Sequence, residues 1–455
     1  MFLSTASKKG LYKVLLAACN NNAEKLLNKK LFFQSIVYSR VPSLKFIFFL
    51  IFFVLKGSIF SKKKCLNLKF QNISIGRFIV SEVSKNAKTF YKSHIFTFNF
   101  FINLIKAGKI LKTCDIYLRK KVKVVYVDHC GYLNGIIFSY FGQRKKVVFT
   151  NNYPYSIFRI DFRKKKNFEF HKFENILKVK YFKSINTRQK KNAKKTINKM
   201  SKTPGKYLPW MKNTKFEKKN IDRIKKYDYL IYCHSFTDAQ LWYGNDGFCN
   251  TFDWLKFTLN ILEKENKKVL IKSHPNYFNK MMGERSYYDK LIFNLIKNKY
   301  KYNKNFYFIN EPIYNYELMK KISKKCILIT HHGTVINESV LFNFKSIASM
   351  ATFWDQKYKI SNTWMNENEY KKLLSKDWHQ LKYTNENDLF TLFHNYYFHK
   401  YSYHGKNYWQ KIISKTAKIN FVKFTEKIEY NFDTMIPQKI HRKIIQKLDK
   451  AIMKI

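Results

Sequence analysis

The second half of the chain alternates short apolar runs with amphipathic stretches. Apolar runs of four or five residues predict buried strands, and apolar positions that recur every three or four residues predict helices between them. The predicted strands are residues 229–233, 268–272, 306–309, 326–330 and 346–349, and the predicted helices are residues 252–265, 287–299, 316–323 and 335–342. This alternation is typical of an open parallel sheet with right-handed crossovers and helices on both faces.

The first half gives a clear pattern only near its end. The run VKVVYV at 122–127 predicts a buried strand, residues 132–141 predict a helix, and KVVFT at 146–150 predicts a second strand. Together they predict a strand–helix–strand unit within a parallel sheet. Earlier in the chain, residues 11–40 show helical periodicity and residues around 70–83 show short alternating stretches.

One apolar run, FIFFLIFFVL at 46–55, lies between Lys45 and Lys56. It is shorter than the roughly 20 residues that a membrane-spanning helix needs, so we predict a buried or interfacial helix. Residues 1–22 do not present the basic stretch, apolar core and small-residue cleavage site of a signal peptide. These features predict a cytoplasmic protein.

The length of 455 residues accommodates two α/β domains, because single hydrophobic cores stop growing near about 250 to 300 residues. An apolar fraction of 45% excludes a disordered or collagen-like chain. The seven cysteines are scattered and form no CxxC pair, so neither a disulfide framework nor a zinc site is predicted.

The chain is strongly basic, with 87 Lys and Arg against 30 Asp and Glu and a net charge of +57. Such a charge attracts nucleic acid, anionic lipid and phosphorylated substrates alike. The abundance of Lys, Asn, Ile, Phe and Tyr also fits an A- and T-rich genome, which would supply lysine without a partner. A nucleic-acid-binding protein is therefore one alternative function, although the sequence shows no RNP, zinc-finger or helix-turn-helix motif.

Three predicted strands of the second half end in polar residues that suit chemistry. These segments are CHSFTD at 233–238, KSHP at 272–275 and THHGT at 330–334, with Glu338 shortly after the last. Ligands of open α/β sheets bind outside the carboxyl ends of the strands, so we expect the three segments to face one crevice.

The last two segments suit a phosphate. Gly333 permits close backbone approach and Thr334 is expected to cap the next helix, whose free N–H groups would face the ligand. Glu338 lies about one helical turn later, where its carboxylate can accept from ribose hydroxyls; the alternative is an ordinary helix cap. Pro275 fixes the chain after His274, so that the imidazole can donate to a phosphoryl oxygen, although an HP dipeptide also occurs in simple turns.

These segments resemble bacterial capsule and surface-polysaccharide glycosyltransferases of the GT-B type, a group similar to capsular Kdo transferases and bacterial sialyltransferases. The resemblance rests on HSFTDA (234–239), residues 247–255, VLIKSHPN (269–276) and ITHHGTVINES (329–339), with DHCGYLNG (128–135) as a weaker match. It implies an α/β, GT-B-like fold of two Rossmann-like doubly wound domains facing a cleft. It also implies sugar transfer from a nucleotide-sugar donor to a surface polysaccharide or its lipid-linked precursor, at the inner face of the cytoplasmic membrane.

The resemblance also implies roles for residues. His274 would contact the donor phosphate, and Gly333 and Thr334 would bind the nucleotide. The full set of expected donor-binding residues is His234, Ser235, Asp238, Lys272, His274, Pro275, His332, Gly333, Thr334 and Glu338.

The mechanism needs a general base from the first domain, and we expect Asp128 to fill that role because it ends the strand at 122–127. His129 could share the role, and Asp238 is a reserve candidate. The alternative is that Asp128 caps the next helix.

No metal or other cofactor is predicted, because no DxD motif is apparent. His331 and His332 are adjacent, so they cannot both face one metal from a regular element, and we expect one to point into the site and the other into the core. The acidic motif of sialyltransferases is not evident in the first half, and Asn245-Asp246-Gly247 lies in the other half. The donor sugar is thus unassigned, and a polyol-phosphate transferase of the CDP-glycerol type is a chemically adjacent alternative.

We expect four parts along the chain. They are an acceptor-side α/β domain with additional N-terminal helices (1–162), a basic helical connector (163–226), a nucleotide-donor-binding Rossmann-like domain (227–430) and a C-terminal amphipathic basic helix (431–455). The last helix has apolar residues four apart with Lys and Arg opposite. It would either lie on an anionic membrane surface or pack on the first domain.

Overall fold

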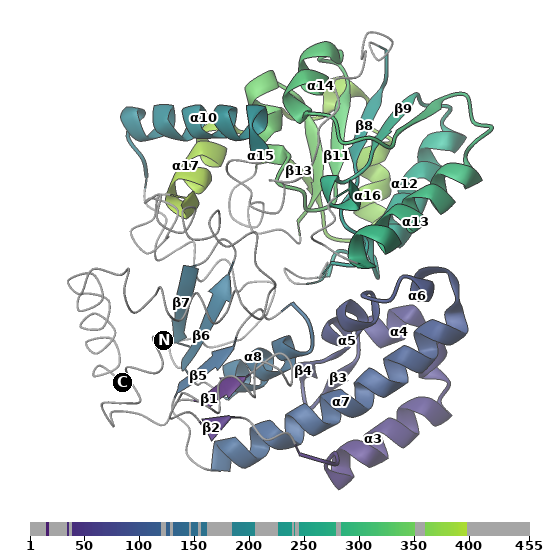
Figure 1. Cartoon of the computed structure of the whole chain (residues 1–455), viewed down its shortest axis with the longest axis vertical. Coiled ribbons are helices and arrows are strands. Elements are labelled where there is room, and N and C mark those ends of the chain that lie inside the picture. The colour runs from purple at the N-terminus through teal and green to yellow at the C-terminus, as the bar shows by residue number, and fades with distance from the viewer. Residues whose placement is uncertain are drawn as a thin grey trace.

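The computed structural model describes residues 15–17, 34–35, 39–119, 124–127, 131–144, 147–152, 156–161, 184–204, 226–238, 241, 245–278, 284–350 and 360–397. These residues form two lobes, each built around a β-sheet (Figure 1).

The larger sheet lies in the second half of the chain and has six strands, all parallel. Its order is β10-β9-β8-β11-β12-β13, formed by β10 (Phe306–Ile309), β9 (Val269–Lys272), β8 (Tyr229–Tyr232), β11 (Ile327–Thr330), β12 (Ser346–Ser349) and β13 (Asn362–Trp364). Every residue of β8, β9, β11 and β12 is buried, as expected for parallel strands that are covered on both faces. The predicted parallel α/β sheet is confirmed.

The direction of winding changes at β8. The chain runs from β8 through β9 to β10 on one side and then adds β11, β12 and β13 on the other side. The carboxyl ends of β8 and β11 therefore flank a topological switch point, the position at which open α/β sheets bind their ligands.

Helices cover both faces of this sheet. Successive side chains of β8 enter different cores: Ile231 packs in the core that includes α12 (Thr251–Lys264) and α13 (Glu284–Lys299), whereas Leu230 packs in the core that includes α14 (Asn315–Lys321). A third core joins α10 (Thr187–Lys202), α15 (Ile336–Ser339) and α17 (Glu386–Tyr397), while α16 (Glu367–Leu374) closes the first one. The basic helix α10 thus packs its small apolar stripe on the second lobe. The three predicted boundaries between the four parts stay a prediction.

The smaller sheet has five strands in the order β2-β1-β5-β6-β7. They are β2 (Gln34–Ser35), β1 (Leu15–Ala17), β5 (Val124–Val127), β6 (Val147–Asn152) and β7 (Ser156–Asp161), and all neighbours are parallel except β6 and β7. The helix α8 (Asn134–Gln143) connects β5 to its parallel neighbour β6, which confirms the predicted strand–helix–strand unit.

One expectation for the first half is wrong. Residues 11–40, expected to be helical, contain β1 and β2. The stretch at 70–83, for which no element is predicted, holds the helix α5 (Gly76–Val83) after two very short strands, β3 (Lys69–Phe70) and β4 (Ile73–Ser74). A short apolar run suits either a strand or a helix, and here pairing of β1 with β5 decides the outcome.

The rest of the first lobe is helical. Its long helix α7 (Ser93–Arg119) packs against α5 and α8, and α3 (Leu44–Leu55) lies on the outer side of α7, with the short α4 (Lys62–Leu66) and α6 (Lys88–Tyr91) nearby (Figure 1). In α3 only Phe46 and Phe53 are buried, so most of its apolar side chains are exposed or half-buried. No helix within the described ranges combines the length and the apolar character needed to cross a bilayer.

The two lobes meet at the carboxyl end of β8. Tyr132 Oη in the first lobe donates to Asp238 Oδ1 in the loop after β8 at 3.2 Å, and the Phe90 and Phe252 rings lie 5.7 Å apart. Leu241 packs into the core of the first lobe. The loop after β8 therefore faces the first lobe, as a site shared by two lobes requires.

Candidate functional site

Three histidines gather where β8, β9 and β11 end. His234 follows β8, His274 follows β9 and His332 follows β11, and because these strands are parallel neighbours their carboxyl ends meet. The ring of His234 lies 3.8 Å from that of His332 and 5.3 Å from that of His274, measured between centroids. The structure thus brings together the three strand ends that the sequence predicts to meet.

The three imidazole rings have lowered pKa values. Burial lowers the pKa of His234, and it lowers the pKa of His274 and His332 well below 6.5, with the neighbouring histidines adding to the effect for both. All three are therefore neutral near pH 7.

Hydrogen bonds set which nitrogen of His274 carries a proton. The backbone N–H of Asn276 donates to His274 Nδ1 at 3.2 Å, so the proton of the neutral ring is on Nε2. Pro275 begins the 3₁₀ turn η6 (Pro275–Phe278) that places this amide. The HP pair thus presents an N–H donor, as the sequence analysis expects.

Lys272 lies near His274 and interacts electrostatically with Glu338. Lys272 ends β9 and is 1% exposed; burial lowers its pKa to about 8, against the opposing effect of Glu338. Burial raises the pKa of Glu338 to about 7, although Asn315 and Lys272 oppose that shift. Lys272 Nζ also lies 5.6 Å from the centroid of the Tyr232 ring. A buried lysine in this position is suited to hold an anion.

Several buried polar atoms around these strand ends have no hydrogen-bond partner among the described residues. They are Tyr232 Oη, Asn276 Oδ1, Asn310 Oδ1 and Glu338 Oε2. Buried polar groups in proteins are nearly always paired, and each unpaired one costs about 1–3 kcal/mol. Four such atoms at one edge of one sheet are typical of a site that awaits a polar ligand.

The loop after β8 is held by a carboxylate on α13. Ser235 Oγ donates to Asp289 Oδ2, and the amide and hydroxyl of Thr237 donate to Asp289 Oδ1 at 3.0 and 3.1 Å. Ser235, expected to bind the donor, here directs its proton to Asp289 and fixes the loop that carries His234. Burial raises the pKa of Asp289 to about 6.

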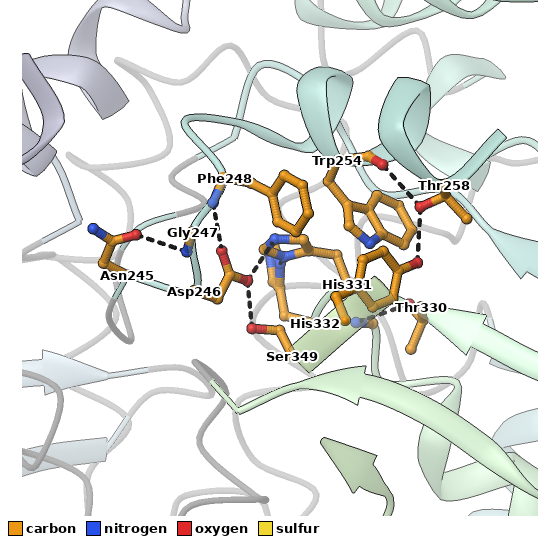
Figure 2. Close-up of polar contacts among 12 residues, drawn as sticks. Asn245, Asp246, Gly247, Phe248, Trp254, Thr258, Thr330, His331, His332 and Ser349 are labelled. Carbon is orange, nitrogen blue, oxygen red and sulfur yellow. Dashed lines mark hydrogen bonds and ion pairs between the residues drawn. The ribbon is translucent and has the colours of Figure 1, made fainter. Parts of the chain in front are cut away.

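The adjacent residues His331 and His332 point to different surroundings, as expected. His331 is 2% exposed and lies between Trp254 and Trp364, with ring centroids 5.4 and 6.0 Å away, whereas His332 lies beside His234. Figure 2 shows His331 joined to His332 on one side and to Asp246 on the other. Asp246, which the sequence places only in the Asn245-Asp246-Gly247 segment and not among the expected site residues, thus contacts the site through His331.

Thr334 does not cap the next helix, which corrects the sequence-based expectation. Residues 335–342 form the four-residue helix α15 followed by the 3₁₀ turn η8 (Val340–Phe342), and the N-cap is Val335, without a side-chain hydrogen bond. Thr334 is exposed. Such a short helix offers little dipole, because the macrodipole is a sum over aligned peptide units.

Gly333 is required for a different reason from the one expected. Its amide donates to Thr330 Oγ1 at 3.1 Å, and a Cβ at Gly333 would lie 2.5 Å from that oxygen. The close approach is thus to the end of β11, and it turns the chain toward Glu338. The roles of Gly333 and Thr334 as nucleotide ligands stay predictions.

The expected general base lies outside the described residues. Asp128 and His129 directly follow β5, and the described chain resumes at Gly131, next to Tyr132. Since Tyr132 reaches Asp238, the reserve candidate, this part of the first lobe comes close to the loop that carries His234. The assignment of Asp128 stays a prediction.

The described residues hold no group of three or more His, Cys, Asp or Glu side chains arranged to bind a metal ion. The site instead offers one buried ammonium, three imidazoles and several unpaired oxygens, a donor set that suits a phosphorylated organic ligand.

Comparison with known proteins gives distant structural likenesses. A scan against family models finds no match, and a search of curated proteins finds none either. One similar solved structure is the beta Kdo 2,4 transferase KpsC of Thermosulfurimonas dismutans, at 10% identity and a TM-score of 0.37 over 60% of this chain and 79% of that one. Another is the UDP-GlcNAc 2-epimerase of Methanocaldococcus jannaschii in complex with UDP-GlcNAc and UDP, at 14% identity and a TM-score of 0.28 over 63% and 79% of the two chains.

Proposed function

We propose that the chain is a glycosyltransferase that moves a sugar from a nucleotide-sugar donor to a surface polysaccharide or its lipid-linked precursor. One observation carries this proposal. At the switch point of a parallel sheet, a buried lysine and an imidazole N–H donor lie beside buried oxygens that have no partner. The lysine and the imidazole N–H suit a departing nucleotide phosphate, and the unpaired acceptor oxygens suit hydroxyl groups of the donor.

In the proposed reaction the bond between the sugar and the donor phosphate breaks, and the nucleotide leaves with the electron pair. Lys272 supplies a positive charge, and its pKa rises when the anion binds. His274 donates its Nε2 proton in a hydrogen bond to a phosphoryl oxygen. Glu338 accepts from a ribose hydroxyl of the nucleotide, and Asp128 takes the proton of the acceptor hydroxyl as the new glycosidic bond forms.

The proposal is tested by calorimetric titration of the full chain with UDP, CDP, CMP and CDP-glycerol. We expect one nucleotide to bind, and His274→Ala and Lys272→Met to weaken its binding about tenfold or more, since hydrogen bonds to charged groups contribute about 1.5–3 kcal/mol. The exposed His379 is the matched control, and His379→Ala should bind as the wild type does.

Two results would contradict the proposal. The wild type would bind none of the four compounds, or His274→Ala and Lys272→Met would bind as tightly as His379→Ala. Binding and turnover of CDP-glycerol alone would instead assign the polyol-phosphate transferase alternative.

We further propose that α3 holds the protein on an anionic membrane surface, where a lipid-linked acceptor would lie. The side chains of Phe48, Phe52 and Leu55 are 70%, 57% and 79% exposed. The exposed Lys45 and Lys56 flank them, so the apolar face is complemented by positive charge at both ends. The C-terminal segment 431–455, expected either to serve the same purpose or to pack on the first domain, lies outside the described residues.

A further inference from the structure

A chain of buried hydrogen bonds leads away from the three-histidine cluster to a carboxylate. His332 Nδ1 and His331 Nδ1 lie 2.7 Å apart, and His331 Nε2 lies 2.9 Å from Asp246 Oδ2 (Figure 2). His332, His331 and Asp246 are 8%, 2% and 1% exposed. The proposed reaction gives no role to the far end of this chain.

The carboxylate at the far end is built to stay ionised. Ser349 Oγ donates to Asp246 Oδ2, and the backbone N–H of Phe248 donates to Oδ1 at 3.3 Å. Burial alone would raise the pKa of Asp246, but the His331 ring and these donors outweigh it and hold the pKa below its usual value. Gly247 makes the turn possible: its φ is +100°, and a Cβ there would lie 2.8 Å from the backbone nitrogen of Glu367.

This carboxylate determines which histidine nitrogens carry protons. An ionised Asp246 only accepts, so the proton between it and His331 is on His331 Nε2. A neutral His331 then has a lone pair on Nδ1 and accepts from His332 Nδ1 across the 2.7 Å contact. His332 therefore has its lone pair on Nε2, the one nitrogen of the two rings that takes part in neither of these hydrogen bonds.

We propose that Asp246 and His331 form a proton store behind His332, which is filled when the phosphate of a nucleotide binds. The step moves protons only. A proton from solvent bonds to His332 Nε2, and the proton on His332 Nδ1 passes to His331 Nδ1. His331 becomes an imidazolium paired with Asp246, while His332 stays neutral and donates from Nε2 to a phosphoryl oxygen.

The charges around His332 explain why the proton should be stored one residue away. His234 faces it from the β8 loop and His274 from the end of β9, and burial, the largest cause, lowers the pKa of His332. A positive charge on His332 itself is therefore disfavoured. At His331 the same charge lies against the Asp246 carboxylate.

Other titratable groups near the His332–His331–Asp246 hydrogen bonds do not hold the stored proton in their place. Glu338 lies on the Lys272 side, Asp238 lies in the loop with His234, and Tyr370 faces Asp246 with its pKa raised by burial. His331 and Asp246 touch no ligand in this scheme, so they are positioning residues. The inference rests on the proposed function, because it deepens the role of the same site.

The test measures proton uptake on binding of UDP, CDP or CMP, whichever binds most tightly. Affinity is followed between about pH 7 and about pH 8, and calorimetry is repeated in buffers of different ionisation enthalpy. We expect the wild type to take up about one proton more per nucleotide than Asp246→Asn and His331→Asn. We also expect both variants to bind about tenfold more weakly at pH 7, the cost of about one pKa unit.

The comparison isolates the store because Lys272 and His274 are present in all of these proteins. Bound nucleotide shows that each variant is folded, and His379→Asn should take up as many protons as the wild type. Equal uptake in the wild type and in both variants would overturn the proposal, as would binding without any uptake in the wild type.

Failure of the proposed function looks different, since then none of the four compounds binds the wild type. The store is still tested in that case by ¹⁵N spectra of the histidine side chains in the ligand-free protein. We expect His331 to be protonated on Nε2 and His332 on Nδ1. Protonation of a neutral His332 on Nε2, with Nδ1 bare, would overturn the assignment of the store.

Discussion

Lys272 shows how a single buried charge costs stability. It is buried at the end of β9, where burial lowers the pKa of its ammonium from 10.5 to about 8. A lowered lysine pKa means that the folded state disfavours the charge that the lysine carries at neutral pH. Under the proposed function, binding of the donor phosphate offsets this cost.

We therefore predict that Lys272→Met is more stable than the wild type at pH 7 although it binds nucleotide more weakly. Below pH 8 the lysine is charged in both folded and unfolded chains, so its cost, about 3 kcal/mol, is fully present. As pH rises from about 8 to 10.5, the folded state loses this proton first and the wild type regains stability relative to the variant.

Urea unfolding of both proteins at neutral pH and near pH 10 measures this difference directly. A variant that is less stable than the wild type at neutral pH would show that the ammonium has partners that stabilise the fold.

The sequence predicts which residues lie at the ends of the strands, but it does not predict the residues far along the chain that contact them. His234, Lys272 and His274 follow apolar runs directly, so their position at the sheet edge follows from the pattern. Asp246 meets His331 across 85 positions of sequence and Asp289 meets Ser235 across 54, as the numbering of each pair shows. Such contacts depend on how helices and loops return to the sheet, which periodicity does not encode.

At the scale of elements, the loop after β8 depends on a helix that comes later in the chain. Asp289 of α13 accepts from Ser235 and from Thr237, and His234 lies at the start of this loop. We predict that Asp289→Ala lowers the free energy of unfolding by about 3 kcal/mol, because it leaves buried donors without an acceptor. Nucleotide affinity should fall with it, since His234 loses its support.

Asp289→Asn is the matched control, because an amide oxygen can still accept from Thr237. It should retain most of the stability and most of the affinity for nucleotide in the same unfolding and calorimetric measurements. An Asp289→Ala protein with unchanged affinity would show that the loop needs no anchor on α13.

The exposed apolar face of α3 leads us to predict that the protein binds anionic vesicles. Vesicles of phosphatidylcholine with anionic phosphatidylglycerol should bind the wild type, and the double variant Phe48→Glu, Phe52→Glu should bind about tenfold more weakly or worse, because burying each ring contributes about 1.5–3 kcal/mol. Tyr302, 85% exposed on the second lobe, gives the control Tyr302→Glu. Co-sedimentation at several salt concentrations measures the binding; equal binding by the double variant would remove α3 from the interface.

Helix tips were harder to predict than strands. The pattern at 335–342 suits one regular helix, but the chain forms α15 and then a 3₁₀ turn that ends at Asn343, whose φ is +53°. Short strands are fixed by their buried neighbours, whereas a short helix gains little from its own hydrogen bonds, so local packing decides its length.

At the scale of the molecule, the sequence predicts the parallel sheet of the second half and its chemistry at the carboxyl edge. It does not predict β13 or α16, which lack the apolar runs that mark the earlier elements, and it leaves α17 unassigned although Leu389, Phe390, Leu392 and Phe393 are buried in that helix. Nor does it predict that α3 leaves most of its apolar face uncovered, because the same ten apolar residues would suit a fully buried helix. The contact between Tyr132 and Asp238 likewise becomes visible only in the folded chain.

The most direct test of the whole account is a crystal structure of the full chain with UDP or CDP bound. We predict that the phosphate lies at the carboxyl ends of β8, β9 and β11, with oxygens about 3 Å from His274 Nε2 and from Lys272 Nζ. A nucleotide bound elsewhere on the molecule, with His274 and Lys272 still enclosed by protein alone, would contradict it.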